Sequence, residues 1–161
     1  MSSTTFHGGR GYRLLWGMAF VSLLAACNEQ ATSPGATLPE REAISRSYDF
    51  AQLQRGKQLF RQNCAVCHGA EAEGAANWQQ RDADGKYPPP PLNGTAHAWH
   101  HSHAQLKDVI KKGTLRIGGN MPPWEDRLTE AEMDDIIYWF QAKWSDEIYA
   151  AWYRSHVAAK K

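Results

Sequence analysis

Cys64-Ala65-Val66-Cys67-His68 is the stretch that decides the fold of this chain. Two thiols separated by two residues on a helical turn can add across the two vinyl groups of one porphyrin, which makes two thioether bonds. The imidazole of the next residue then lies where it can bind the iron. C-x-x-C-H is the attachment signature of c-type haem, so we predict one covalent haem bound by Cys64, Cys67 and His68.

A C-x-x-C pair alone also occurs in thioredoxin-like redox sites and as half of a zinc site. His68 directly after the pair, and the lack of a second C-x-x-C in the sequence, argue against both alternatives. The chain has three cysteines, of which the third is Cys27. No second pair is left to form a disulfide.

The first residues are typical of an export signal. Arg10 and Arg13 form a basic region, and an apolar run follows from Leu14 to Ala26. This run is short for a membrane span and has the length of a signal-peptide core. It ends in Leu24-Ala25-Ala26-Cys27, which resembles a bacterial lipobox and implies that Cys27 is lipidated. An ordinary secretory signal and an uncleaved anchor are the alternatives.

The charge balance excludes one class of partner. With Arg10 and Arg13 removed with the signal, 16 of the 18 Lys and Arg residues remain against 17 Asp and Glu residues. The sequence has no basic stripe of the kind that binds a phosphate backbone, so we expect no nucleic-acid partner.

Apolar residues at helical spacing precede the haem motif. Phe50, Leu53 and Phe60 predict a helix that runs into Cys64. After the motif, the chain reaches Pro88-Pro89-Pro90-Pro91-Leu92-Asn93-Gly94. Four consecutive prolines exclude a helix interior and a central strand, so this segment is expected to be extended.

Two further helices are expected in the second half. One runs from about His103 to Lys112, because Ser102 can cap its start and Gly113 can end it. The other begins after Thr129, which forms a capping box with Glu132. Its apolar face is supplied by Met133, Ile136, Ile137 and Phe140. No segment of any length has the period of a strand, and we predict an all-α fold.

A methionine is the expected second iron ligand. Met1 and Met18 belong to the signal, and Met133 lies on the apolar side of the last predicted helix, where a role in the core is the default. Met121 differs, because it lies in Gly118-Gly119-Asn120-Met121-Pro122-Pro123-Trp124. The glycines permit tight turns and the prolines stiffen the loop, so its thioether can be held against the haem.

The chain resembles the class I monohaem cytochromes c over roughly Tyr48 to Trp144. The shared features are a helix before C-x-x-C-H, a Pro-x-Leu-x-Gly segment, a late methionine loop and a last helix rich in aromatic residues. The resemblance implies three to five helices around one haem, with His68 and Met121 as its iron ligands. It also implies that Pro90 offers its carbonyl to the outer ring nitrogen of His68.

The same resemblance implies a close contact between the first and last helices, at Gly56 and Phe60 on one side and Trp139 on the other. We divide the chain into four parts: 1–26, a lipoprotein signal peptide; 27–47, the lipidated cysteine and a flexible tether; 48–145, the cytochrome c domain; and 146–161, a C-terminal helical extension.

Two segments depart from that family. His97, His100, His101 and His103 place four imidazoles in seven residues around Trp99. A second metal site, for copper, is one interpretation, because imidazole suits that metal. We favour another, in which Trp99 and one or two histidines bond the haem propionates and the others are solvated. The cluster lacks the carboxylate or thiolate spacing of a recognised metal site.

The other departure is the tail after Trp144. In residues 145–154, Ile148 and Trp152 are spaced as in an amphipathic helix, and we expect both to be buried against the domain. A docking surface for a redox partner is the alternative interpretation of this helix.

Two axial ligands leave no vacant position on the iron, which favours outer-sphere transfer of one electron between Fe(III) and Fe(II) over catalysis. Sulfur ligation opposite histidine raises the reduction potential. We therefore expect an electron carrier and not an enzyme. Its expected partners are membrane or periplasmic respiratory proteins, such as a quinol-oxidising complex and a terminal oxidase or reductase.

Attachment of the haem after export, as in the family that this chain resembles, implies the periplasm, with the protein held at a bacterial membrane by its lipid anchor. Two alternative functions stay open. A labile Met121 would make a haem-based sensor or a peroxidase, and the segment from His97 to His103 would suit a copper-handling lipoprotein.

Overall fold

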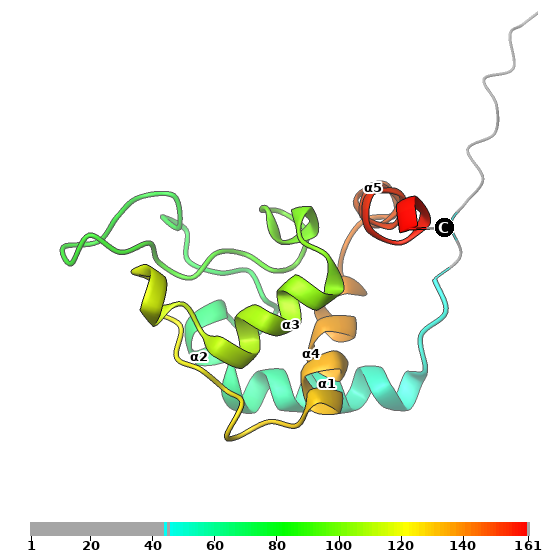
Figure 1. Cartoon of the computed structure of the whole chain (residues 1–161), viewed down its shortest axis with the longest axis horizontal. Coiled ribbons are helices and arrows are strands. Elements are labelled where there is room, and N and C mark those ends of the chain that lie inside the picture. The colour runs from blue at the N-terminus through cyan, green and yellow to red at the C-terminus, as the bar shows by residue number, and fades with distance from the viewer. Residues whose placement is uncertain (1–43, 45, 161) are drawn as a thin grey trace, which may run out of the picture. The chain divides into compact units, whose positions relative to one another are not determined.

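The computed structural model describes residues 44 and 46–160, so the predicted export signal and Cys27 lie outside the described residues. Within this part every regular element is helical, which confirms the predicted all-α fold. The elements, drawn in Figure 1, are α1 (Phe50–Asn63), α2 (Ala65–His68), α3 (His103–Lys112), α4 (Glu130–Gln141), α5 (Asp146–His156) and the 3₁₀ turns η1 (Ala98–His100), η2 (Leu115–Ile117) and η3 (Ala158–Lys160).

Helices α3 and α4 begin where their capping residues predict. The Ser102 hydroxyl accepts from the backbone N–H of Gln105, and the Gln105 side chain accepts from the Ser102 N–H. Thr129 and Glu132 form the same reciprocal pair at the start of α4. Such caps satisfy backbone donors that a helix start leaves free, and each contributes about 1 kcal/mol.

Helix α4 packs on α1 where a glycine allows the backbones to touch. A Cβ atom at Gly56 would lie 2.0 Å from the carbonyl oxygen of Asp135 and 2.9 Å from Cβ of Trp139. One turn later, the fully buried ring of Phe60 lies 4.5 Å from the Trp139 ring, between centroids. The contact that the family resemblance implied between these helices is therefore present.

The hydrophobic core lies against α4. This helix contributes apolar side chains that are at most 2% exposed: Met133, Ile136, Ile137 and Phe140. Leu106 and Ile110 of α3 join them from the other side. Met133 is thus a core residue, as its position predicted.

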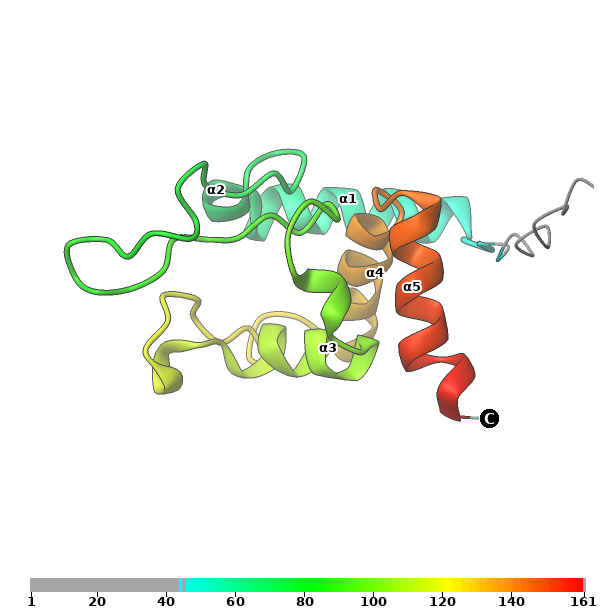
Figure 2. The ribbon, with the colours of Figure 1, turned by 90° about the horizontal axis from the view of Figure 1, so that it is seen from above.

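The C-terminal extension forms a helix and packs on the domain, as expected. Trp152 of α5 is 6% exposed, and its indole N–H donates to the carbonyl of His101 at 2.9 Å. Ile148 is partly buried against the core. Figures 1 and 2 show α5 at the opposite end of the domain from η2 and from the loop at residues 75–87.

Among the helices of the described residues, none is both long enough and apolar enough to cross a membrane.

Candidate haem site

The haem motif follows α1 with almost no break. Cys64 caps the end of α1 and starts the single turn α2, in which the His68 N–H donates to the Cys64 carbonyl at 2.9 Å. Both thiols are free, and Cys64 is the less exposed of the two. Burial, with a smaller effect of Cys67, raises the pKa of the Cys64 thiol to about 12.

The imidazole of His68 is buried and oriented by one hydrogen bond. Its ring is 9% exposed, and Nδ1 lies 3.0 Å from the carbonyl oxygen of Pro90. A carbonyl can only accept, so Nδ1 carries the proton and Nε2 carries the lone pair. Burial lowers the pKa of His68, against the opposing effect of the Pro90 bond, and keeps the ring neutral. Nε2 receives no hydrogen bond from the described residues, which fits a ligand of haem iron.

Backbone hydrogen bonds to the loop after His68 hold the proline segment in place. Pro89 accepts from the N–H of Ala75 at 2.9 Å, while the N–H of Leu92 donates to Ala72 at 2.8 Å. These two bonds fix the backbone on either side of Pro90. Because prolines have no N–H, residues 88–91 offer only acceptors, and the Pro90 carbonyl is the one that meets His68.

The methionine loop closes on Thr114, just after α3. The N–H of Met121 donates to Thr114 Oγ1 at 3.0 Å, and the N–H of Thr114 donates to the Met121 carbonyl at 2.8 Å. Gly113 has a φ of 64°, and a Cβ atom there would lie 2.5 Å from the Met121 carbonyl oxygen. Only glycine fits this approach, so Gly113 both ends α3 and admits the returning loop.

The two halves of the candidate site come from separate segments. Figure 2 shows α2 and the loop at residues 113–128 on facing sides of the same end of the domain. Met121 is partly buried and packs against the hydrophobic core. Its position in a braced loop agrees with the predicted role as second ligand, which stays a prediction.

The histidine cluster does not converge on one point. His103 Nε2 lies 2.6 Å from a carboxylate oxygen of Asp134, whereas the rings of His97 and His101 are 5.8 Å apart between centroids. His100 packs edge-on against Trp99. Across the described part of the chain, no three His, Cys, Asp or Glu side chains are grouped so that they could bind a metal ion. The copper interpretation therefore has no support from the geometry, and a propionate contact of Trp99 stays a prediction.

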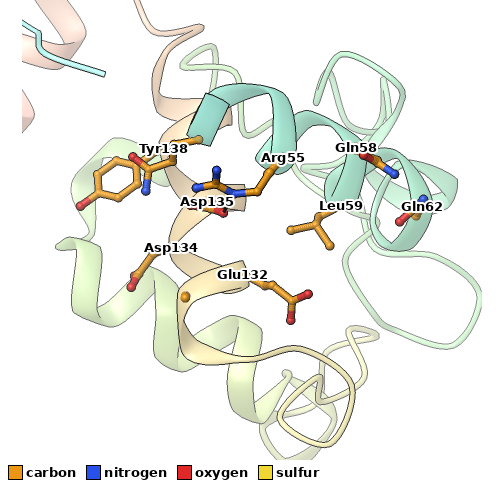
Figure 3. Close-up of a pocket in the computed structure, with 10 residues that line it drawn as sticks. Arg55, Gln58, Leu59, Gln62, Glu132, Asp134, Asp135 and Tyr138 are labelled. Atoms are coloured by element: carbon orange, nitrogen blue, oxygen red, sulfur yellow. Dashed lines mark hydrogen bonds and ion pairs between the residues drawn. The ribbon is translucent and has the colours of Figure 1, made fainter. Parts of the chain in front are cut away.

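A hollow of about 620 Å³ lies elsewhere, between α1 and α4 (Figure 3). Most of the residues that line it have polar or charged side chains, and Arg55 donates to the buried carboxylate of Asp135 at 2.9 Å. None of the residues predicted to bind haem lines this hollow. It is the outer surface of the α1–α4 contact and not the haem site.

Two residues that shape the site were missed by the sequence reasoning. Thr114 braces Met121, and the indole of Trp144 donates to the carbonyl of Leu92 at 2.9 Å, which ties the proline segment to the end of α4. A threonine between Gly113 and a Gly- and Pro-rich loop was a signal for the first. No local pattern in the sequence predicts the hydrogen bond from Trp144 to Leu92.

Comparison with known proteins identifies the family of this chain. The model of the family described as "Cytochrome C oxidase, cbb3-type, subunit III" matches residues 51–140, which is more than half of the chain. The chain belongs to this cytochrome c family. Its members carry haem c covalently, so the predicted cofactor is confirmed as a property of the family.

Several named proteins are similar to the chain. Cytochrome c-551 of Bacillus subtilis is 27% identical over 130 residues, which cover 81% of this chain and 93% of that protein. Cytochrome c1 of Blastochloris viridis is 33% identical over 63% of this chain, and the cbb3-type cytochrome c oxidase subunit CcoP of Azospirillum sp. is 30% identical over 56%. A crystal structure of cytochrome cL from Methylophaga aminisulfidivorans is 22% identical, with a TM-score of 0.46 over 65% of this chain and 61% of that one.

Most of these relatives are longer than the matched region. The chain spans 36% of cytochrome c1 and 28% of CcoP, in contrast to nearly all of cytochrome c-551. The cytochrome c domain is therefore the part that these proteins share with this chain.

Proposed function

We propose that this chain is a one-electron carrier of a bacterial respiratory chain, with Cys64 and Cys67 bonded to one haem c and with His68 and Met121 as the iron ligands. The haem, when bound, would supply an iron that exchanges a single electron between its ferric and ferrous forms. The observation that carries the proposal is the buried His68, whose Nδ1–H is directed to Pro90 while Nε2 is left unpaired among the described residues.

The chain's own residues favour transfer without rearrangement. The His68 ring is held from one side by Pro90, and from another it faces the buried ring of Phe60, at 6.5 Å between centroids. A ring fixed in this way keeps one orientation in both redox states, which lowers the cost of reorganisation. The hydrogen bond to Pro90 also makes Nε2 more electron-rich.

Met121 is proposed to fill the other axial position. The backbone N–H and carbonyl of Met121 both bond to Thr114, which holds the residue in place within its loop. Its side chain is partly buried against the hydrophobic core. A sulfur ligand held in this way would exclude added ligands from the iron and raise the reduction potential.

The anchor and the partners are proposed from the sequence and the relatives. The lipobox at Cys27 supports a lipid anchor on the periplasmic face of a bacterial membrane. Names of relatives include cytochrome c1 and a cbb3-type oxidase subunit. They support electron transfer between a quinol-oxidising complex and a terminal oxidase or reductase, for a protein that is not itself an enzyme.

Carbon monoxide binding tests the ligand set. The reduced wild-type protein should resist carbon monoxide, whereas Met121→Ala should bind it rapidly and show a high-spin spectrum. Met133→Leu, a change in the core, is the matched control and should behave as wild type. Rapid binding by the wild type would instead indicate a sensor or a peroxidase.

Membrane fractionation tests the anchor separately. Cys27→Ala should move the protein from the membrane fraction to the soluble fraction and leave its haem spectrum unchanged. Continued retention of Cys27→Ala in the membrane would contradict lipidation.

A further inference from the structure

Arg46 belongs to the segment that the sequence assigns to the tether, yet its side chain is only 14% exposed. Nη1 donates to the carbonyl of Trp144 at 2.7 Å, and Nη2 donates to the carboxylate of Asp146 at 2.8 Å. The guanidinium carbon lies 4.5 Å from the centre of the Tyr149 ring, which adds a cation–π contact. One arginine is thus held by three residues at the start of α5.

Tyr48 strengthens the same attachment. Its ring meets Tyr138 of α4 at 6.2 Å and Tyr149 of α5 at 6.3 Å, both between centroids and both edge-on. Burial raises the pKa of the Tyr48 phenol above its usual range, as expected for a side chain enclosed by other rings. Tyr48 therefore contacts both α4 and α5, just before α1 begins.

The start of α5 is itself tied to the part of the domain that carries the haem motif. Trp144, whose carbonyl receives Arg46, donates its indole N–H to Leu92, two residues after Pro90. Trp152, two turns along α5, donates to His101. An attachment at Arg46 is therefore an attachment to the rigid domain and not to a loose tail.

Arg46 is attached at the end of the domain where the predicted tether joins it. Figures 1 and 2 show the chain entering α1 at the α5 end, away from η2 and the loop at residues 75–87. The sequence predicts a flexible tether over residues 27–47, and a flexible chain of that length has a root-mean-square end-to-end distance of about 25 Å. The point where such a tether joins the domain sets which end of the domain stays close to the anchor.

We propose that Arg46 and the start of α5 form a clamp that fixes where the tether leaves the haem domain and so keeps the η2 end directed away from the membrane. This gives the C-terminal extension a positioning role. The clamp follows from the described contacts alone, whereas its effect on orientation rests on the proposed lipid anchor at Cys27.

Trypsin tests the clamp on the full-length haem protein, because a protease cuts only when a held segment opens. Replacing both Asp146→Ser and Tyr149→Leu removes two of the three contacts of Arg46. Cleavage after Arg46 should become at least tenfold faster in this variant. Arg154→Ala, an exposed change on the same helix, is the control and should leave the rate unchanged.

An unchanged haem spectrum would show that the double variant is folded. Equal rates of cleavage after Arg46 in the wild type and in the double variant would overturn the clamp.

Energy transfer tests the orientation. The lipidated protein is bound to phosphatidylethanolamine and phosphatidylglycerol vesicles that carry a headgroup fluorophore, and transfer from this fluorophore to the haem is followed by fluorescence lifetime. Arg46→Gln, which leaves α5 intact, should broaden the distance distribution and increase the quenched fraction at least twofold. Identical distributions would overturn the orientation.

Failure of the wild type to bind these vesicles would reject both the lipid anchor and the orientation. The trypsin rates would then still decide the clamp, so the two failures are distinguishable.

Discussion

The two sides of the haem site are built in different ways. His68 lies in the single turn α2, directly after the long helix α1, with its ring 6.5 Å from that of Phe60 between centroids, and its partner Pro90 is fixed by backbone bonds on both sides. Met121 lies in an irregular loop, where its own backbone bonds to Thr114 and the N–H of Trp124, at the end of the loop, donates to the carbonyls of Ile110 and Lys111 in α3. The histidine side therefore depends on the whole α1–α4 core, whereas the methionine side depends on a few hydrogen bonds to Thr114 and to the end of α3.

This difference indicates which of the two proposed iron ligands can be released while the domain stays folded. Loss of the histidine side should require loss of the fold, because its contacts are part of the core. The methionine side can open while α1 and α4 stay packed, since local openings cost less than global unfolding. Variants on the two sides should therefore fail in different ways.

The largest effect is expected at the α1–α4 contact. Gly56→Val would place side-chain atoms against the Asp135 backbone and the Trp139 side chain, where even a Cβ atom comes within 2.9 Å. The free energy of unfolding should fall by at least about 3 kcal/mol, as measured by denaturant titration with tryptophan fluorescence. The transition should stay single, because the support of His68 is lost together with the core.

Gln54→Ala, on the exposed face of the same helix, is the matched control and should change the free energy of unfolding by less than about 0.5 kcal/mol. Equal stabilities of the Gly56 and Gln54 variants would show that the histidine side does not depend on this contact.

The next effect is expected on the methionine side. Thr114→Val removes the acceptor of the Met121 N–H and keeps the shape of the side chain. An unsatisfied buried N–H costs about 1–3 kcal/mol, so release of Met121 should become about tenfold easier. Imidazole added to the ferric protein competes with Met121, and its apparent affinity should rise by that factor.

Thr95→Val is the control, because Thr95 is exposed and its hydroxyl bonds to Asn93, away from the methionine loop. If both threonine variants bind imidazole as weakly as the wild type, the loop does not depend on Thr114, and the proposed contrast between the two sides is wrong.

The same contrast separates what the sequence could predict from what it could not. The haem motif and the caps at Ser102 and Thr129 were predictable, because each depends on neighbours in sequence or on one recognisable spacing. The close approach at Gly56 followed only from resemblance to a family, and the structure shows it. The contact between His68 and Pro90 followed from resemblance to a family, and the structure shows the bond itself.

The features that were missed are either too short to leave a pattern in the sequence or depend on contacts between distant residues. The turns η1 and η2 contain three residues each and carry no strong periodicity. Arg46 was placed in the tether because its neighbours are polar, but its partners lie about 100 residues further along the chain. No local pattern can reveal a contact of that kind.

A smaller effect is expected from the partner of His68. Pro90→Ala frees the backbone that directs the carbonyl at Nδ1 and so weakens this hydrogen bond. A hydrogen bond contributes about 1 kcal/mol, which corresponds to about 40 mV for one electron. Because the bond makes the imidazole more basic and so favours ferric iron, the reduction potential should rise by up to that amount in a spectroelectrochemical titration. Pro88→Ala, which changes a proline with no hydrogen bond to His68, should leave the potential unchanged.

The smallest effect is expected at Glu71, in the loop after His68. Its carboxylate bonds to Lys143 and Arg61, and these bonds, Lys143 first, hold the pKa of Glu71 below its usual value of 4.5. A lowered pKa means that the contribution to stability is complete above the unfolded-state value and is lost as the pH falls through the folded-state value. Glu71→Gln should therefore be slightly less stable than wild type at neutral pH and equally stable in acid, as measured by thermal unfolding across that range.

Because Glu71 is exposed, high salt should remove the difference between the Glu71→Gln variant and the wild type at neutral pH. A large difference that survives salt would mean that the ion pairs, and not the backbone bonds between this loop and Pro89 and Leu92, hold the histidine side in place. The histidine side would then resemble the methionine side in depending on a few local contacts.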